Sequence, residues 1–400
     1  MRFTSLRGIR ILTAALALAA GSAVCSNAGT DFGWRGSTYV ADQDQGYKVK
    51  FGGRIMNDWV FNGPDDDLKF AMPSITDGTR FRRARLFSSG TIYHNVIYKA
   101  QFDFAGGDAK FKDMYMGVKD VPILGMLRVG HQKEPAGLET LTSSKVITFL
   151  ERASVTHLMP ERQTGILATR RLNNGKGTIA AGVFQEANKY GDATGNDYAF
   201  TGRVALAPVL KGHGRNLVHV GASVSYRQTA EDSVFSAKAK PENPIAPTFL
   251  ETGAITSTHH TLVGGEFAAN YNQFSVQSEV ALAVVNSDSS GNPTLSSYYV
   301  QGSWFLTGES RGYKHGEMSG TKPTRNFDGK GGPGAWELAA RYSKADFNDG
   351  VVTGGEYAVT TVGVNWYLNP YTRLMLNYAY TDLTGVGKMN SIMTRFQISF

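Results

Sequence analysis

The last ten residues of the chain, SIMTRFQISF (391–400), alternate strictly between two kinds of side chain. One set is Ile392, Thr394, Phe396, Ile398 and Phe400, and the other is Ser391, Met393, Arg395, Gln397 and Ser399. A repeat of two residues places the two sets on opposite faces of a β-strand. A strand at the very end of a chain frays unless it is tied down. The fold must therefore cover its apolar face and pair with its edge.

The same alternation recurs in long stretches along the whole chain. Clear cases are TIYHNVIYKAQFDF (91–104), NLVHVGASVSYRQ (216–228), QFSVQSEVALAVV (273–285) and TTVGVNWYLNPYTRLMLNYAY (360–380). Many of these strands reach ten residues or more, which is longer than usual in globular proteins. Their polar face carries charges, and their apolar face ends in aromatic residues. This pattern predicts a transmembrane antiparallel β-barrel, all-β in class; a soluble β-sandwich with shorter strands is the alternative.

The connections favour the barrel. Strands are expected near 47–60, 80–88, 91–104, 111–119, 126–131, 164–172, 177–185, 197–206, 216–227, 261–271, 274–284, 298–306, 335–344, 356–368, 371–381 and 391–400. Short links at Ser89–Gly90, Asn272–Gln273 and Asn369–Pro370 alternate with long links such as 132–162 and 228–260. Outer-membrane barrels have short turns on one side and long loops on the other. The segment 307–334 breaks this rhythm, because it is long on the short-turn side.

The first residues resemble an export signal. Arg2, Arg7 and Arg10 precede an apolar run and then small residues, so that 1–28 is predicted to be a cleaved signal peptide and 29–400 the barrel domain. An N-terminal anchor helix is the alternative, and the context of Cys25 is a poor match to a lipidation signal. Beyond this segment there is no run of about 18 apolar residues, so the exported chain is expected to be soluble or to cross a membrane as a barrel.

Several stretches resemble the phosphate- and polyphosphate-selective porin family of Gram-negative outer membranes. They are FRRARLFSSGTIYHNVIYKAQFDFA (81–105), FKDMYMGVKD (111–120), LRVGHQKEPAGLETLTSSKVITFLER (127–152), SYYVQGSWFLTGESRGYK (297–314), GAWELAARYS (334–343) and GGEYAVTTVGVNWYLNPYTRLMLNYAY (354–380). The resemblance implies a trimeric, anion-selective channel of about sixteen strands in the cell outer membrane. The terminal Phe400 is similar to the ending that such barrels present to the barrel-assembly machinery.

Arginines supply the expected anion path. Their planar forks donate two hydrogen bonds to an oxyanion and stay charged. Alternation places six cations inward: Lys99, Arg203, Arg227, Arg341, Arg373 and Arg395. Arg80, Arg82, Arg83 and Arg85 add positive charge, although with two parities they cannot all face the lumen. Either these side chains form a positive path, or they pair with lumenal acids such as Glu266, Glu279 and Glu337.

The long link 132–162 is the expected constriction loop. By resemblance, Ser143, Ser144 and Arg152 line the family's phosphate site. Asp113 should point inward, where it either accepts the proton that phosphate still carries or orients a neighbouring Lys or Arg. Lys133 and Lys145 are candidates for a further lysine that family members place near the constriction. The basic segment 307–334 forms either a positive collar at the periplasmic mouth or a solvated loop.

The predicted function is passive diffusion of phosphate or polyphosphate, with an anion or small-solute porin of different selectivity as the alternative. Nucleophile-elbow, HExxH and P-loop motifs do not occur, so neither an enzyme nor a catalytic, metal or cofactor site is expected. A hydrolase with a Ser/His/acid set at the barrel rim is the rival of another class. The expected partners are phosphate or polyphosphate anions, outer-membrane lipid, two further copies in a homotrimer and the assembly machinery, and no nucleic acid.

Overall fold

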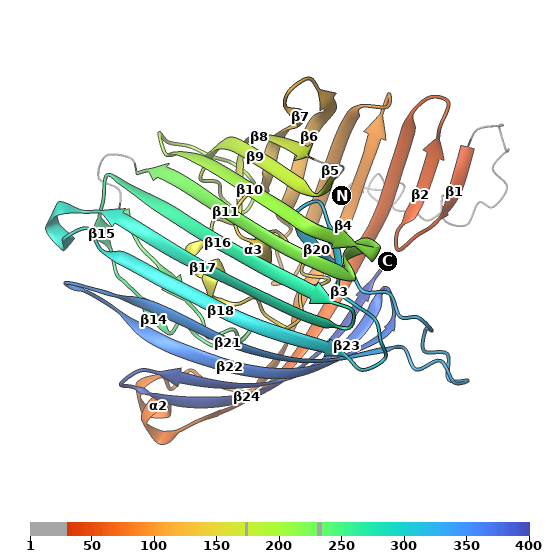
Figure 1. Cartoon of the computed structure of the whole chain (residues 1–400). Coiled ribbons are helices and arrows are strands. Elements are labelled where there is room, and N and C mark those ends of the chain that lie inside the picture. Colours follow the sequence, from red (N-terminus) through yellow and green to blue (C-terminus); the bar gives the residue numbers. More distant parts are fainter. Residues whose placement is uncertain (1–29, 173–174, 230–233) are drawn as a thin grey trace, which may run out of the picture.

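The computed structural model describes residues 30–172, 175–229 and 234–400, so the predicted signal peptide 1–28 lies outside the described residues. Sixteen strands form one closed antiparallel barrel (Figure 1). They are β3 (Tyr47–Pro64), β4 (Gly78–Ile92), β5 (Val96–Asp103), β6 (Lys110–Val121), β7 (Gly125–Lys133), β8 (Arg162–Leu172), β9 (Gly177–Gln185), β10 (Tyr198–Lys211), β11 (Asn216–Gln228), β16 (His259–Tyr271), β17 (Phe274–Asn286), β18 (Thr294–Phe305), β21 (Ala335–Asp349), β22 (Val352–Asn369), β23 (Thr372–Leu383) and β24 (Gly387–Ser399).

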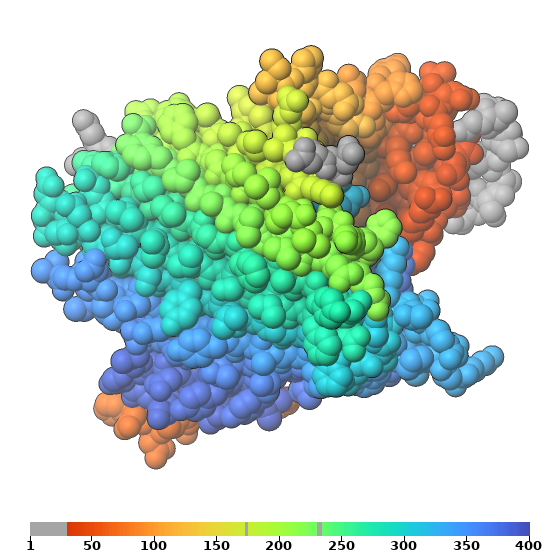
Figure 2. Space-filling model, in the orientation of Figure 1, coloured from red at the N-terminus to blue at the C-terminus, as the bar shows by residue number. Residues whose placement is uncertain are grey.

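Pairing of the last strand with the first closes the barrel. Met389–Ser399 of β24 lie antiparallel to Arg54–Pro64 of β3. At the chain end, the Phe400 amide donates to the Gly53 carbonyl at 3.1 Å, and the Gly53 amide donates to the Phe400 carbonyl at 2.6 Å. The final strand therefore has no free edge, as the ending of the sequence requires. In the space-filling view the wall from β9 to β18 is a continuous surface (Figure 2).

Burial along the strands is inverted relative to a water-soluble protein. In β24 the apolar Ile392 and Phe396 are 50% and 48% exposed, whereas Met393 and Arg395 are each 1% exposed. The same inversion runs along β10 and β17, where Arg203 and Gln277 are buried while Val204 and Val276 are exposed. An apolar outer face and a polar inner face are typical of a barrel that lipid surrounds. The sequence prediction of an all-β membrane barrel is confirmed.

No helix in the described ranges is long and apolar enough to cross a membrane. The helical elements are the short α2 (Asp66–Ala71), α3 (Leu138–Leu141), η1 (Ser154–Leu158), η3 (Gly212–Gly214) and η4 (Asp288–Ser290).

Two details of the wall differ from the sequence prediction. The turn between β4 and β5 lies at residues 93–95 rather than at Ser89–Gly90, because Tyr93 and His94 take positive φ values of 45° and 68°. A hairpin of β1 (Thr30–Trp34) and β2 (Thr38–Asp42) was not predicted. It pairs with Tyr47–Phe51 of β3, the part of that strand that β24 does not reach, and lies beside β3 in Figure 1.

Three segments fill the lumen. The link 134–161 carries α3 and η1, and its Leu150, Ala153 and Leu158 belong to the same buried apolar cluster as wall residues of β17 and β18. The segment 234–258 contributes β12 (Val234–Phe235), β13 (Lys238–Ala239), β14 (Leu250–Glu251) and β15 (Ile255–Thr256). From the opposite end of the barrel, the link between β18 and β21 contributes the hairpin of β19 (Gly312–Lys314) and β20 (Glu317–Ser319). The segment 307–334 is thus neither a simple collar nor a purely solvated loop.

Candidate functional site

A cavity of about 250 Å³ lies where the inward link 134–161 approaches the wall strands β3 to β7. Nine cationic side chains line it, against three carboxylates. The cations are Arg54, Arg83, Arg85, Lys99, Arg128, Lys133, Arg152, Arg162 and Arg203, and the acids are Asp113, Glu161 and Glu317. The lining of this central cavity therefore carries an excess of positive charge, although Arg85 and Arg203 also pair with Asp103 and Glu266, which lie outside the lining.

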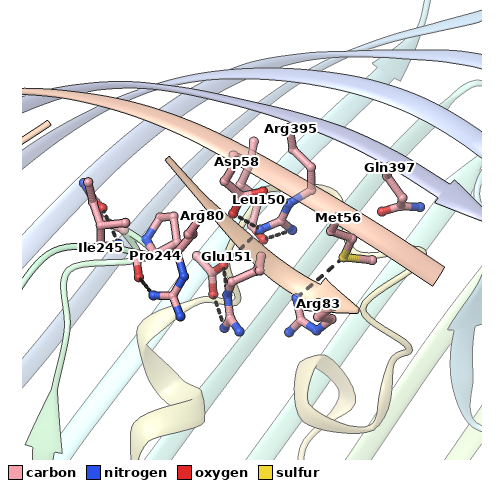
Figure 3. A network of polar contacts seen from close by, with 12 residues as sticks. Met56, Asp58, Arg80, Arg83, Leu150, Glu151, Pro244, Ile245, Arg395 and Gln397 are labelled. Atoms are coloured by element: carbon pink, nitrogen blue, oxygen red, sulfur yellow. Dashed lines mark hydrogen bonds and ion pairs between the residues drawn. The ribbon is translucent and has the colours of Figure 1, made fainter. Parts of the chain in front are cut away.

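A β-bulge in β4 changes which arginines of the cluster at 80–85 face the lumen. Met56 of β3 pairs with Arg83, and the next residue, Asn57, pairs with Phe81, so Arg82 has no partner in the ladder. A bulge lets consecutive residues share one face of a sheet. Arg82 and Arg83 both point inward, as Figure 3 shows for Arg83 beside Met56, while Phe81 is 58% exposed. The expectation that neighbouring arginines of opposite parity cannot both face the lumen is therefore wrong for Arg82 and Arg83.

Ser143 and Ser144 both line the central cavity. The Nη1 atom of Arg54 donates to Ser144 Oγ at 2.7 Å, which joins the wall strand β3 to the inward link 134–161. The sequence analysis missed Arg54. Its parity with Met56 and Asp58, opposite to the exposed Ile55 and Trp59, could have identified it as an inward residue.

Arg152 and Lys133 line the cavity and also brace the loop. Arg152 donates from Nε to the Glu139 carbonyl at 2.8 Å and from Nη2 to the Thr142 carbonyl at 2.6 Å. Lys133 Nζ donates to the carbonyls of Thr140 and of Leu141, the latter at 3.0 Å. Both side chains thus bond to neutral carbonyls, and neither has a carboxylate partner among residues 30–172, 175–229 and 234–400.

Asp113 points into the cavity, where two cations hold it. It pairs with Lys99 and accepts from Arg162 Nε at 2.8 Å. With both oxygens occupied, its geometry fits the orientation of these two cations better than acceptance of a proton from an anion.

Most of the other predicted arginines are neutralised by a carboxylate. The pairs are Arg82 with Glu151, Arg85 with Asp103, Arg203 with Glu266, Arg227 with Glu134, Arg341 with Glu242, and Arg395 with Asp58. Of the three acids expected as arginine partners, Glu266, Glu279 and Glu337, only Glu266 forms an ion pair with an arginine in the described part of the chain. Glu279 accepts from the Glu139 amide and from Tyr299, and Glu337 accepts from Asn365 and Tyr367.

Seven of the predicted cations do not line the central cavity, namely Arg80, Arg82, Lys145, Arg227, Arg341, Arg373 and Arg395. Arg82 faces Glu151, and Arg227 lines a separate cavity of about 550 Å³ together with His157 and Phe235. Within the described residues, Arg54 and Arg83 are the arginines of β3 and β4 that line the central cavity without an ion pair.

Two further cavities continue from the central one and share Ser143 and Lys145 with each other. One cavity, of about 560 Å³, is lined by Arg35, Lys48 and Lys50. The other, of about 450 Å³, is lined by Arg171 of β8 and by Lys314 of the β19–β20 hairpin. Burial, followed by repulsion from Arg54 and Lys99, lowers the pKa of Lys145 to about 8. The hairpin also contributes Glu317, and burial raises the pKa of its carboxyl.

The sequence over residues 49–400 matches the family described as phosphate-selective porin O and P. The chain belongs to this family. It is 26% identical over 415 residues to Porin O of Pseudomonas aeruginosa, covering 92% of this chain and 91% of that protein. It is also 26% identical over 373 residues to an uncharacterized protein of Caulobacter vibrioides, covering 90% of this chain and 73% of that protein.

Solved structures agree on the fold. An anion-selective porin from Comamonas acidovorans matches with a TM-score of 0.54 at 12% identity, covering 88% of this chain and 100% of that chain. An outer membrane protein of Vibrio cholerae, described in its trimer form, matches with a TM-score of 0.51 at 12% identity, covering 88% and 99%. This member of the porin O and P family is an outer-membrane porin of a Gram-negative bacterium.

Proposed function

We propose that this porin passes anions by diffusion and prefers phosphate or polyphosphate, with the central cavity as its selective site. The proposal rests on Arg54 and Arg83, which both line this cavity and have no carboxylate partner in the described part of the chain, and on Ser144, which accepts from Arg54. Guanidinium and hydroxyl donors can replace part of the water around a phosphate ion. The family description supports phosphate as the solute.

The neighbouring residues take supporting roles in this proposal. Ser143 and Arg152 complete the donor set from the loop side, and Lys133 adds charge. Asp113 keeps Lys99 and Arg162 directed into the passage, so its carboxylate acts through these cations and not on the anion. Lys145 lies at the junction with the next two cavities, where it would receive an anion that leaves the site.

We also infer the assembly and surroundings of the channel. The trimer form described for the Vibrio cholerae protein of the same fold supports a homotrimer. The apolar outward side chains support contact with outer-membrane lipid. Phe400, which lies at the end of the closing strand, is proposed to be the residue that the assembly machinery binds.

Single-channel chloride current titrated with phosphate tests the substrate. Phosphate should block the current at low concentration, because the preferred ion occupies the cavity and leaves slowly. Arg83→Gln should raise the half-blocking concentration about tenfold, the effect of losing one charged hydrogen bond of about 1.5 kcal/mol. Lys69→Gln on α2 removes the same charge far from the cavity and should leave the block unchanged. A wild-type current that phosphate does not affect would favour an anion porin of different selectivity.

A further inference from the structure

The two adjacent arginines of the β4 bulge have opposite electrostatic surroundings. Arg82 donates from Nε and Nη2 to the two oxygens of Glu151, at 2.6 and 2.8 Å. Among the described residues, the one hydrogen-bond partner of the Arg83 side chain is the sulfur of Met56, at 3.8 Å from Nη1, and its Nε has none. Of the two, only Arg83 lines the central cavity. The bulge brings Arg82 and Arg83 to the same face, and they differ because, of the two, the carboxylate of Glu151 pairs only with Arg82.

Glu151 belongs to a set of four charges that sum to zero. Its Oε1 also accepts from Arg395 Nη2 at 3.1 Å, and Arg395 is held by both oxygens of Asp58 at 2.6 Å (Figure 3). The side chains of Arg395 and Asp58 are fully buried, and those of Arg82 and Glu151 are 29% and 13% exposed. Because two cations face two carboxylates, this set adds no net charge to the lumen.

The carboxylate stays ionised at this position. Burial acts to raise the pKa of Glu151, but Arg82 and then Arg395 and Arg83 lower it well below its ordinary value. Its backbone is fixed as well, since Arg341 Nη2 donates to the Glu151 carbonyl at 3.1 Å. The negative charge is therefore permanent and held in place from β4, β21 and β24.

We propose that Glu151 is a positioning residue that determines the anion selectivity of the passage. It binds Arg82 and cancels its charge, so that Arg83 acts as the single uncompensated arginine of the bulge. This inference depends on the proposed function only in that the channel conducts anions. A second free arginine beside Arg83 would attract anions more strongly, and it would also slow their release.

Reversal potentials across a potassium chloride gradient test this role. In Glu151→Gln the freed charge of Arg82 should raise the chloride-to-potassium permeability ratio about threefold. Arg82→Gln should lower the ratio, because Glu151 then has one cation fewer. Arg82→Gln combined with Glu151→Gln removes both charges and should return the ratio to the wild-type value. Glu151→Asp keeps the charge and should remain within about twofold of wild type.

This pattern of signs separates a role in selectivity from simple loop support. A loop that has merely loosened would change conductance in the same direction for all four variants, and that result would overturn the proposal. Glu151→Gln with an unchanged permeability ratio would do so too. If Glu151→Gln does not fold, an unchanged ratio in Arg82→Gln would overturn the proposal in its place. A wild type that phosphate does not block would defeat the substrate proposal while leaving this one standing.

Discussion

Replacing Asp58 with Asn tests the electrostatic bond across the closing seam of the barrel. Asp58 of β3 and Arg395 of β24 are direct partners in the ladder, and Arg395 donates to both Asp58 oxygens at 2.6 Å. Both side chains are fully buried. Removing one partner of a buried pair leaves an uncompensated charge and costs about 3–5 kcal/mol. Because Glu151 still accepts from Arg395 at 3.1 Å, we expect the lower limit of about 3 kcal/mol.

The assay is urea unfolding of the barrel in detergent micelles, followed by the shift in gel mobility between folded and heated samples. Asp58→Asn should reduce the free energy of unfolding by about 3 kcal/mol. Asp58→Leu with Arg395→Met replaces the pair with apolar side chains and should recover most of that loss. Asp108→Asn breaks an exposed pair with Lys189 and should not move the transition. A transition of Asp58→Asn that coincides with the wild type would refute the view that this pair holds the seam.

Three other variants test particular parts of the structure. Gly52→Ala would put a Cβ 2.3 Å from the Phe400 carbonyl oxygen, so the yield of folded barrel should fall, whereas Gly63→Ala on the same strand, 3.8 Å from the nearest atom, should fold normally. Chloride conductance should decrease as the pH rises through about 8, because Lys145 then loses its positive charge, and Lys145→Gln should have a lower conductance at neutral pH that no longer changes over this range. Ser144→Ala removes the acceptor of Arg54 and should raise the half-blocking phosphate concentration about fivefold, the effect of about 1 kcal/mol, and an unchanged block would remove Ser144 from the site.

Alternation was enough to predict the wall from sequence. A strand between lipid and a polar lumen has one apolar and one polar face along its whole length. The residue type at each position therefore indicates whether the side chain faces the lipid or the lumen. Ile392 and Arg395 lie on the sides that parity assigns to them. The ends of the strands could not be predicted in the same way. A turn such as 93–95 depends on the positive φ of Tyr93 and His94, and these residue types do not by themselves indicate a turn.

The lumen could be predicted only in part. Its length and the family resemblance indicated that the link after β7 folds into the lumen, but the sequence did not indicate which acids neutralise which arginines. Glu242 meets Arg341, and Glu134 meets Arg227, through tertiary contacts between segments about 100 residues apart. Parity also fails at a bulge, since the extra residue Arg82 reverses the alternation on one strand without any marker such as Gly or Pro.

The inward link 134–161 is attached to the closing seam of the barrel, because Arg395 bonds to both. Arg395 binds Asp58 across the seam, and the same guanidinium donates to the Leu150 carbonyl at 2.6 Å and to Glu151. Gln397, two residues further along β24, donates to the Lys145 carbonyl at 2.9 Å. The loop therefore reaches its final position only when the last strand is paired in register with the first. A slip of one residue would turn Arg395 and Gln397 outward and break their bonds to Leu150, Glu151 and Lys145, so the register of the seam also fixes the position of the inward link 134–161.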